Sequence, residues 1–193
     1  MSKPKTLATP QTIVWTFFSA LKRQISRIDP GYRDAEQDYA ICLFLSVNVV
    51  ECFMNVYFRV LVSTQGYTNF ESELLSDIKK RISLDKKLKT WPKNYLGKPL
   101  DFGRFEVQSF IKLKDQRNAL MHFVSSHESL DLPDSLTVHG LADMSALKTL
   151  THEQVKRYPR IIRVFAYEIF RAQGVEERNL ANNFHRWFGE PDL

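Results

Sequence analysis

One long apolar segment constrains the fold of this chain more than any other feature. Residues 40–62 read AICLFLSVNVVECFMNVYFRVLV, and the helical pattern around them runs from about Asp34 to about Ser63, before Gln65 and Gly66 break it. A helix of roughly 30 residues is about 45 Å long. Glycine is scarce elsewhere too, with 7 in 193 residues, so long segments lean helical and the sequence predicts an all-α fold.

This segment is long enough to suggest a membrane span, but its composition argues against one. Asn48, Glu51, Asn55 and Arg59 interrupt it at spacings of three, four and four. The charged pair, Glu51 and Arg59, would each cost about 2.5–3.5 kcal/mol or more at the centre of a bilayer. We therefore expect no membrane partner.

The four polar residues fall on one narrow stripe of the predicted helix. Two interpretations stay open. The stripe is either a thin polar edge that meets solvent, or a face that meets other polar groups inside the fold. In the second case Glu51 needs a cationic partner, because an unpaired buried carboxylate is costly, and Arg117 is the candidate.

Capping and breaking residues divide the rest of the chain into further helices. The expected helices run from Thr9 to Pro30, from about Asp34 to about Ser63, from Asn69 past Ile82, from near Leu100 past Leu120, from a capping box at Thr151 to Gly174 with a kink or restart at Pro159, and over residues 176–188. Residues 85–99 are expected to be a basic loop. Residues 125–149 are loop-like, with room for a short strand or a helical turn. We predict a single helix-bundle domain over residues 1–193.

The charge balance is mildly basic, with a formal charge of +5 and a sequence pI of about 9.2. This suits nucleic acid or another polyanion, although many soluble proteins share it. A basic stretch surrounds Trp91 and Tyr95. It contains Lys79, Lys80, Arg81, Lys86, Lys87, Lys89, Lys93 and Lys98. Either a phosphate-binding surface with aromatic stacking or a solvated loop would use such residues.

Cys42 and Cys52 lie ten positions apart in the long apolar segment. On one helix they would be about 15 Å apart along the axis, too far for a disulfide. We expect free thiols in a reducing cytoplasm. The N-terminal segment has no apolar core of the signal-peptide kind.

The stretch KDQRNALMHF, residues 114–123, carries the strongest candidate site. Phe110 and Leu113 mark an apolar face, and Arg117 lies on the same side. An arginine on a core-facing stripe needs a partner or an interface. His122 is five positions further, about 140° around a regular helix. The two side chains converge if the helix unwinds between them, or if two copies meet across a dimer axis.

Such a pair can cleave RNA. A neutral imidazole takes a proton from a ribose 2′-hydroxyl, and its protonated form returns one to the leaving oxygen. A guanidinium group binds phosphate oxygens and stabilises the charge that develops on them. Two copies of Arg117 and His122 around one phosphate would act without metal and form a 2′,3′-cyclic phosphate, with Asn118 orienting the histidine or binding the phosphate.

IKLKDQRNALMHF resembles the signature of HEPN domains, a family of small helical bundles. Arg117, Asn118 and His122 match its motif of arginine, a polar residue, a short spacer and histidine. Many members are metal-independent ribonucleases, commonly toxins or antiviral effectors, that act as dimers. Others have lost activity and bind nucleotides or proteins. The resemblance covers the motif and, loosely, residues 34–172. The first and last helices look like additions, and the long loop after the motif is a departure.

The resemblance implies a cytoplasmic, homodimeric endoribonuclease with Arg117, Asn118, His122 and Glu51 as its site, Glu51 orienting Arg117. Its partners would be RNA or a nucleotide, a second copy, and an antitoxin or regulatory protein. No cofactor and no metal are expected. The alternatives are a non-catalytic HEPN-like module that binds a nucleotide or a protein, and an unrelated bundle with a structural buried arginine.

Two weaker patterns were weighed beside this motif. RNLANNFH, from Arg178 to His185, also pairs an Arg-Asn dipeptide with a histidine, and we interpret it as the exposed face of an amphipathic tail helix. His127 and His139 lie among acidic residues in the loop beyond the motif. Their irregular spacing favours ordinary loop polarity over a metal site.

Overall fold

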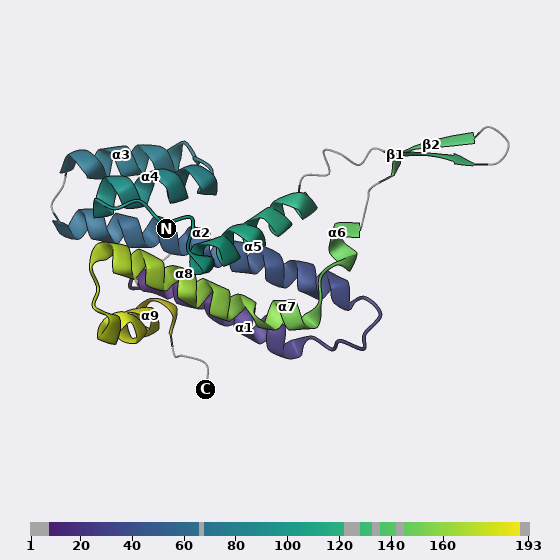
Figure 1. Ribbon diagram of the computed structural model, residues 1–193, viewed down its shortest axis with the longest axis horizontal. Helices are drawn as coiled ribbons and strands as arrows, with labels where there is room; N and C mark the ends of the chain where they lie inside the picture. Colours follow the sequence, from purple (N-terminus) through teal and green to yellow (C-terminus); the bar gives the residue numbers. More distant parts are fainter. Residues whose placement is uncertain (1–7, 66–67, 122–127, 133–135, 142–144, 190–193) are drawn as a thin grey trace, which may run out of the picture.

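The computed structural model describes residues 8–65, 68–121, 128–132, 136–141 and 145–189. Within these ranges the structure is predominantly helical, which confirms the all-α, helix-bundle prediction at that level. Figure 1 shows the long helices side by side, with a two-stranded hairpin extending away from one end of the bundle.

The elements follow one another along the chain without a repeat. They are α1 (Gln11–Arg27), α2 (Ala35–Gln65), α3 (Thr68–Lys79), α4 (Leu84–Leu96), α5 (Phe105–Met121), β1 (Glu128–Leu132), β2 (Leu136–Leu141), α6 (Ser145–Lys148), α7 (His152–Lys156), α8 (Tyr158–Gln173), the 3-10 helix η3 (Glu177–Asn179) and α9 (Leu180–Phe188).

The predicted long helix is present as α2 and lies at the centre of the bundle. Helices α1, α3, α4, α5 and α8 all contact it. By length and composition alone α2 could cross a membrane, but 56% of its most apolar window is buried by the rest of the chain. A core helix of a soluble protein meets the same length and composition criteria.

The first and last helices belong to the same core. Phe18 of α1 makes edge-on contacts with Phe184 and Phe188 of α9, at ring-centroid distances of 5.6 and 5.4 Å. Phe188 also approaches Phe53 of α2, at 5.0 Å. The two helices that look like additions in the sequence therefore cover α2 directly.

Several sequence signals for helix ends are confirmed. Thr151 and Gln154 form the reciprocal capping box that starts α7. Pro159 lies in the first turn of α8, so the chain restarts a helix there. Gly174 ends α8 in the left-handed conformation with φ of 94°, which a side chain would disfavour.

The expectation of a basic loop over residues 85–99 is wrong, because most of this segment is helix α4. Ser83 caps it by accepting a hydrogen bond from the backbone N–H of Lys86, at 3.3 Å. The buried side chains follow a helical spacing: Leu84, Leu88, Trp91 and Tyr95. This apolar face outweighs the unfavourable Pro92 inside the helix.

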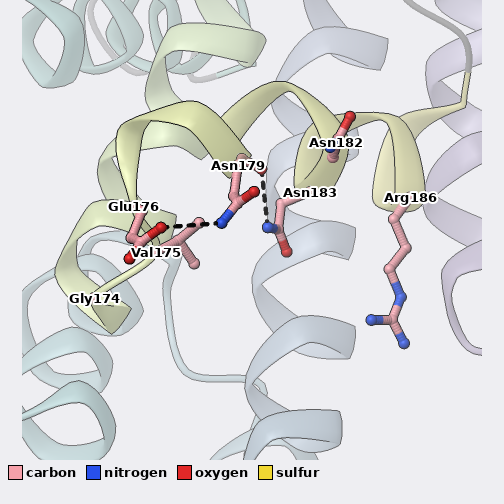
Figure 2. Close-up of a pocket in the computed structure, with 7 residues that line it drawn as sticks. All are labelled: Gly174, Val175, Glu176, Asn179, Asn182, Asn183 and Arg186. Atoms are coloured by element: carbon pink, nitrogen blue, oxygen red, sulfur yellow. Dashed lines mark hydrogen bonds between the residues drawn. The ribbon is translucent and has the colours of Figure 1, made fainter.

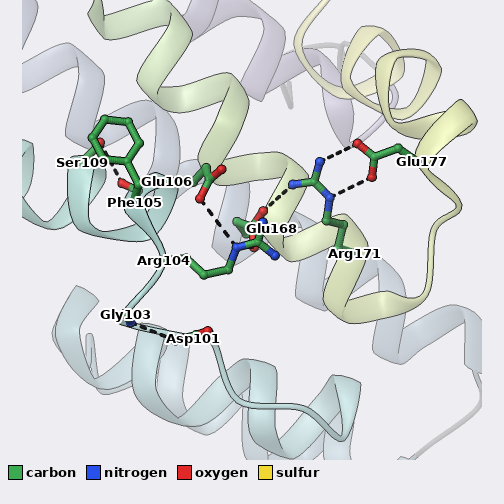
Figure 3. A network of polar contacts seen from close by, with 9 residues as sticks. All are labelled: Asp101, Gly103, Arg104, Phe105, Glu106, Ser109, Glu168, Arg171 and Glu177. Carbon is green, nitrogen blue, oxygen red and sulfur yellow. Dashed lines mark hydrogen bonds and ion pairs between the residues drawn. The ribbon is translucent and has the colours of Figure 1, made fainter.

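Helix α5 begins at Phe105, five residues later than near Leu100 as predicted. The Asp101 side chain accepts a hydrogen bond from the Gly103 backbone N–H at 2.9 Å and so forms a turn instead (Figure 3). Next to this turn, Arg104 forms an ion pair with Glu168 of α8 at 3.1 Å.

The long segment after the motif contains more regular structure than a loop. Strands β1 and β2 pair antiparallel, with Leu130 opposite Val138 and Leu132 opposite Leu136, and with an irregular step between Glu128 and Leu130. Helix α6 follows and leads back to the bundle (Figure 1).

Candidate functional site

Helix α5 carries the candidate motif on a stripe that leaves the core toward the C-terminal end of the helix. Val107, Phe110 and Leu113 are buried, with Leu113 only 2% exposed. Arg117, four residues on, is half-buried, and Met121 is 53% exposed. The core-facing stripe therefore ends in a polar and partly open surface.

Arg117 has an unsatisfied group at this transition. Its Nε atom is shielded from solvent and has no hydrogen-bond partner among the described residues. A buried guanidinium N–H without an acceptor is unfavourable. The hydrogen-bonding capacity of Arg117 is therefore incompletely used within the described residues. Asn118 is half-buried beside it.

His122 directly follows the last residue of α5 and lies outside the described residues. The convergence of Arg117 and His122 therefore stays a prediction. Met121, the residue before the histidine, is the last described residue of α5.

The expected pairing of Glu51 with Arg117 is corrected by the structure. Among the described residues the ion partner of Glu51 is Lys87 of α4, at 2.6 Å between Nζ and Oε1. The Lys87 side chain is 4% exposed and that of Glu51 is 33% exposed. Lys87 also lies over the ring of Trp91, 5.6 Å from its centroid. This partner was missed because residues 85–99 were expected to be a loop, which would not hold a lysine against α2.

A second cation on α5, Lys114, was not singled out in the sequence. It is buried and forms ion pairs with Asp85 of α4 and with Asp115, the latter at 3.1 Å. Burial lowers the pKa of Lys114, but hydrogen bonds to the two carboxylates outweigh this and raise its pKa above the ordinary value. The sequence signal that could have indicated a buried Lys114 is its position next to Leu113, on the core-facing stripe of α5. Lys114 thus has two carboxylate partners, whereas the Nε of Arg117, one turn on, has none among the described residues.

Along the polar stripe of α2, some positions meet solvent and others meet polar groups of the fold. Asn48 and Arg59 are exposed, so these two positions meet solvent. Glu51 meets Lys87 at the contact with α4. Asn55 is half-buried, and its Oδ1 atom has no partner among the described residues. The stripe is therefore a boundary between core and solvent.

The second Arg-Asn…His pattern is on the surface, as predicted. Arg178 is 80% exposed and pairs with Glu176 at 2.7 Å, and His185 is exposed on α9. A concavity of about 440 Å³ lies beside it, lined by Gly174, Val175, Glu176, Asn179, Asn182, Asn183 and Arg186 (Figure 2). The Asn183 amide donates to the Asn179 carbonyl at 3.0 Å, so part of its polar lining is already satisfied internally.

The two thiols are free, as expected. Burial, with a smaller contribution from Asp38, raises the pKa of Cys42 to about 12. Burial, together with Glu51, raises the pKa of Cys52 to about 11. Both thiols are therefore protonated and unreactive near neutral pH.

Within the described ranges no three His, Cys, Asp or Glu side chains gather as metal ligands would. The side chains of the loop histidines, His127 and His139, lie outside the described part of the structure. The expectation of ordinary loop polarity there stays a prediction.

Comparison with known proteins yields no match to this chain from a family model, a curated protein or a solved structure.

Proposed function

We propose that this protein is a metal-independent endoribonuclease of the HEPN type. The observation that carries the proposal is the contrast between two cations on α5. Two carboxylates satisfy Lys114, whereas Arg117, three residues on, has a shielded Nε with no partner in the described structure. A guanidinium group binds phosphate oxygens strongly, through two parallel charge-assisted hydrogen bonds.

In the proposed reaction the neutral imidazole of His122 removes the proton from a ribose 2′-hydroxyl. The resulting oxygen attacks the adjacent phosphorus, and the bond from phosphorus to the 5′-oxygen breaks. The imidazolium returns the proton to that 5′-oxygen, which leaves a 2′,3′-cyclic phosphate and a free 5′-hydroxyl. Arg117 stabilises the charge on the non-bridging oxygens, and Asn118 orients the histidine or contributes a further hydrogen bond.

A homodimer is part of this proposal. Helical geometry separates residues 117 and 122 by about 140°, so a second copy is one way to bring a guanidinium and an imidazole to one phosphate. The exposed Met121 at the end of the inward stripe of α5 supports a contact there. We place the HEPN-like core at residues 34–172. The cytoplasm and an antitoxin or regulatory partner follow from the family resemblance alone.

One observation favours a second candidate, a non-catalytic module that binds a nucleotide or a protein. Glu51 pairs with Lys87, so the carboxylate expected to orient Arg117 is committed elsewhere. A guanidinium that no carboxylate orients still binds phosphate, but its geometry is less constrained for catalysis.

RNA cleavage in the presence of a chelator tests the proposal. We expect wild-type protein to cut single-stranded RNA in excess EDTA. His122→Ala should lower the rate by 10²-fold or more, about the contribution of one general acid-base group, with little change in Tm. The matched control is His185→Ala, which removes the exposed histidine of the second pattern and should leave the rate unchanged.

Two outcomes contradict the proposal. A wild-type protein that cuts no RNA but binds nucleotides supports the non-catalytic module. Equal loss of activity in the His122 and His185 variants would show that the cleavage does not depend on the motif of α5.

A further inference from the structure

The positive charge of this protein is concentrated in 20 residues. Residues 79–98 contain eight of the 27 Lys and Arg residues and one of the 22 Asp and Glu residues. This stretch therefore carries a formal charge of +7, and the remainder of the chain carries −2. The overall charge of +5 comes entirely from one segment.

The structure exposes almost all of this charge. The exposed residues are Lys79, Lys80, Arg81, Lys86, Lys89, Lys93 and Lys98, which we call the cationic face. None of the seven forms an ion pair with another residue in the described ranges. The eighth cation, Lys87, is buried and pairs with Glu51, and Asp85 pairs with Lys114. The single acid of the segment, Asp85, is thus paired with a lysine of α5 and not with any of these seven residues.

Helix α4 gives the cationic face a rigid geometry. Lys86, Lys89 and Lys93 have spacings of three and four, so they share one side of α4 over about 10 Å. The opposite side is held in the core by Leu88 and Trp91. At the turn before α4, Arg81 adopts a positive φ of 51°. These three lysines of the cationic face are therefore fixed on a helix.

An ion pair links the segment of the cationic face to the helix that carries the candidate site. Asp85 in the first turn of α4 pairs with Lys114 of α5, three residues before Arg117. Figure 1 shows α4 and α5 next to each other on the same side of the bundle. A chain of phosphates bound along α4 would have Arg117 within the same region of the molecule.

The neighbouring side chains favour nucleic acid over a lipid surface. No large hydrophobic residue of the segment 79–98 is exposed, so nothing accompanies the lysines into a bilayer. The two aromatic residues of the segment, Trp91 and Tyr95, are 0% and 8% exposed. The idea that they stack on bases is therefore wrong, and recognition must go through the phosphate backbone.

We propose that the cationic face binds the phosphate backbone of RNA without reading its bases and delivers it to Arg117. The delivery step rests on the proposed ribonuclease function, but the binding step does not. Because no ring stacks on bases, the face should bind duplex RNA as well as a single strand, with a strong dependence on salt.

The test measures fluorescence anisotropy of a labelled 20-nucleotide oligouridylate and of an RNA duplex at several salt concentrations. The protein carries His122→Ala to prevent cleavage. The test variant adds Lys86→Gln, Lys89→Gln and Lys93→Gln, and the matched control adds Arg23→Gln, Arg27→Gln and Arg160→Gln on α1 and α8. All six positions are exposed, so both triple variants should keep the parent Tm.

We expect the test variant to bind both RNAs at least 10-fold more weakly. Its plot of log affinity against log salt should be shallower by about 2 for the single strand, since each lost phosphate contact removes about 0.7. The control should match the parent. Equal weakening in both triple variants would overturn the proposal, as would binding to anionic phosphatidylserine vesicles but not to RNA.

The same measurements separate this inference from the ribonuclease proposal. If the cationic face binds RNA in a salt-dependent way but the protein never cuts RNA, the binding inference is supported and the ribonuclease proposal is rejected. If the protein cleaves RNA but the three lysine substitutions leave its affinity for RNA unchanged, the ribonuclease proposal is supported and RNA binding by the cationic face is rejected.

Discussion

At the scale of single residues, the two cations of α5 have opposite environments. Lys114 is buried and pairs with Asp85 and Asp115, while the shielded Nε of Arg117 has no acceptor in the described part of the chain. A buried ion pair often contributes little net stability, because desolvation offsets the attraction. A buried donor without an acceptor lowers stability, and such groups often mark sites of function.

Substitution of Lys114 should therefore be tolerated better than substitution of its partner. Lys114→Met removes a buried charge and keeps the aliphatic packing, so the free energy of unfolding should change by less than about 1 kcal/mol. Asp85→Asn leaves Lys114 buried with Asp115 alone and should lower that free energy by about 1–2 kcal/mol. Urea unfolding of both variants measures the difference. A larger loss for Lys114→Met than for Asp85→Asn would contradict the account.

The raised pKa of Lys114 also predicts that the free energy of unfolding depends on pH in the alkaline range. Its folded pKa is raised, so its contribution is fully present below the unfolded pKa of about 10.4 and is lost as the pH rises through the folded pKa. The stability of wild type relative to Lys114→Met should therefore be constant from pH 7 to 9 and decline above about pH 10.5. Urea titrations of both proteins across this range test it. A relative decline already below pH 9 would contradict the raised pKa.

At the scale of elements, the sequence predicts those helix ends that are determined by interactions within one turn of the chain. Thr151 with Gln154 and Gly174 act through backbone hydrogen bonds and φ within one turn, so short stretches of sequence suffice. Helix α4 is not predicted in this way, because its lysines and Pro92 obscure an apolar face that contacts with α2 and α8 stabilise. The cationic partner of Glu51 was lost with that helix, since Lys87 points inward only once α4 is helical.

The start of α5 depends on an ion network that joins it to α8 and η3 (Figure 3). Glu168 is buried and pairs with Arg104 at 3.1 Å and with Arg171, which also forms a two-pronged contact with Glu177 at 2.6 and 3.0 Å. The hydrogen bond from Arg171 lowers the pKa of Glu177. This network fixes the N-terminal end of the helix that carries Arg117.

Glu168→Gln should destabilise the protein because it leaves two arginines facing a neutral amide. We expect a loss of about 2 kcal/mol, which corresponds to a fall in Tm of roughly 4–8 °C for a chain of this size. Glu177→Gln is the control on the exposed side of the same network, with an expected loss below about 1 kcal/mol. Thermal unfolding followed by circular dichroism compares them, and equal shifts would remove the special role of Glu168.

At the scale of the whole molecule, the helices that look peripheral in the sequence are part of the core. Phe18, Phe184 and Phe188 join α1 and α9 to each other, and Phe188 reaches Phe53 of α2. Contacts so distant in sequence are not encoded in local periodicity, which explains why α1 and α9 look dispensable. The exposed charge, in contrast, gathers on the side of α4, and the core-facing stripe of α5 opens at Arg117. The molecule thus combines one continuous core with the cationic face around α4.

The most direct test of the central claim is the chemical nature of the cut RNA end. Wild-type protein is incubated in EDTA with an oligonucleotide and with its 2′-deoxy analogue, and the fragments are weighed by mass spectrometry. We expect fragments that end in a 2′,3′-cyclic phosphate from RNA, none from the 2′-deoxy analogue, and none when Arg117→Ala or His122→Ala is used. Cleavage of the 2′-deoxy analogue, or fragments with a 3′-hydroxyl end, would contradict it.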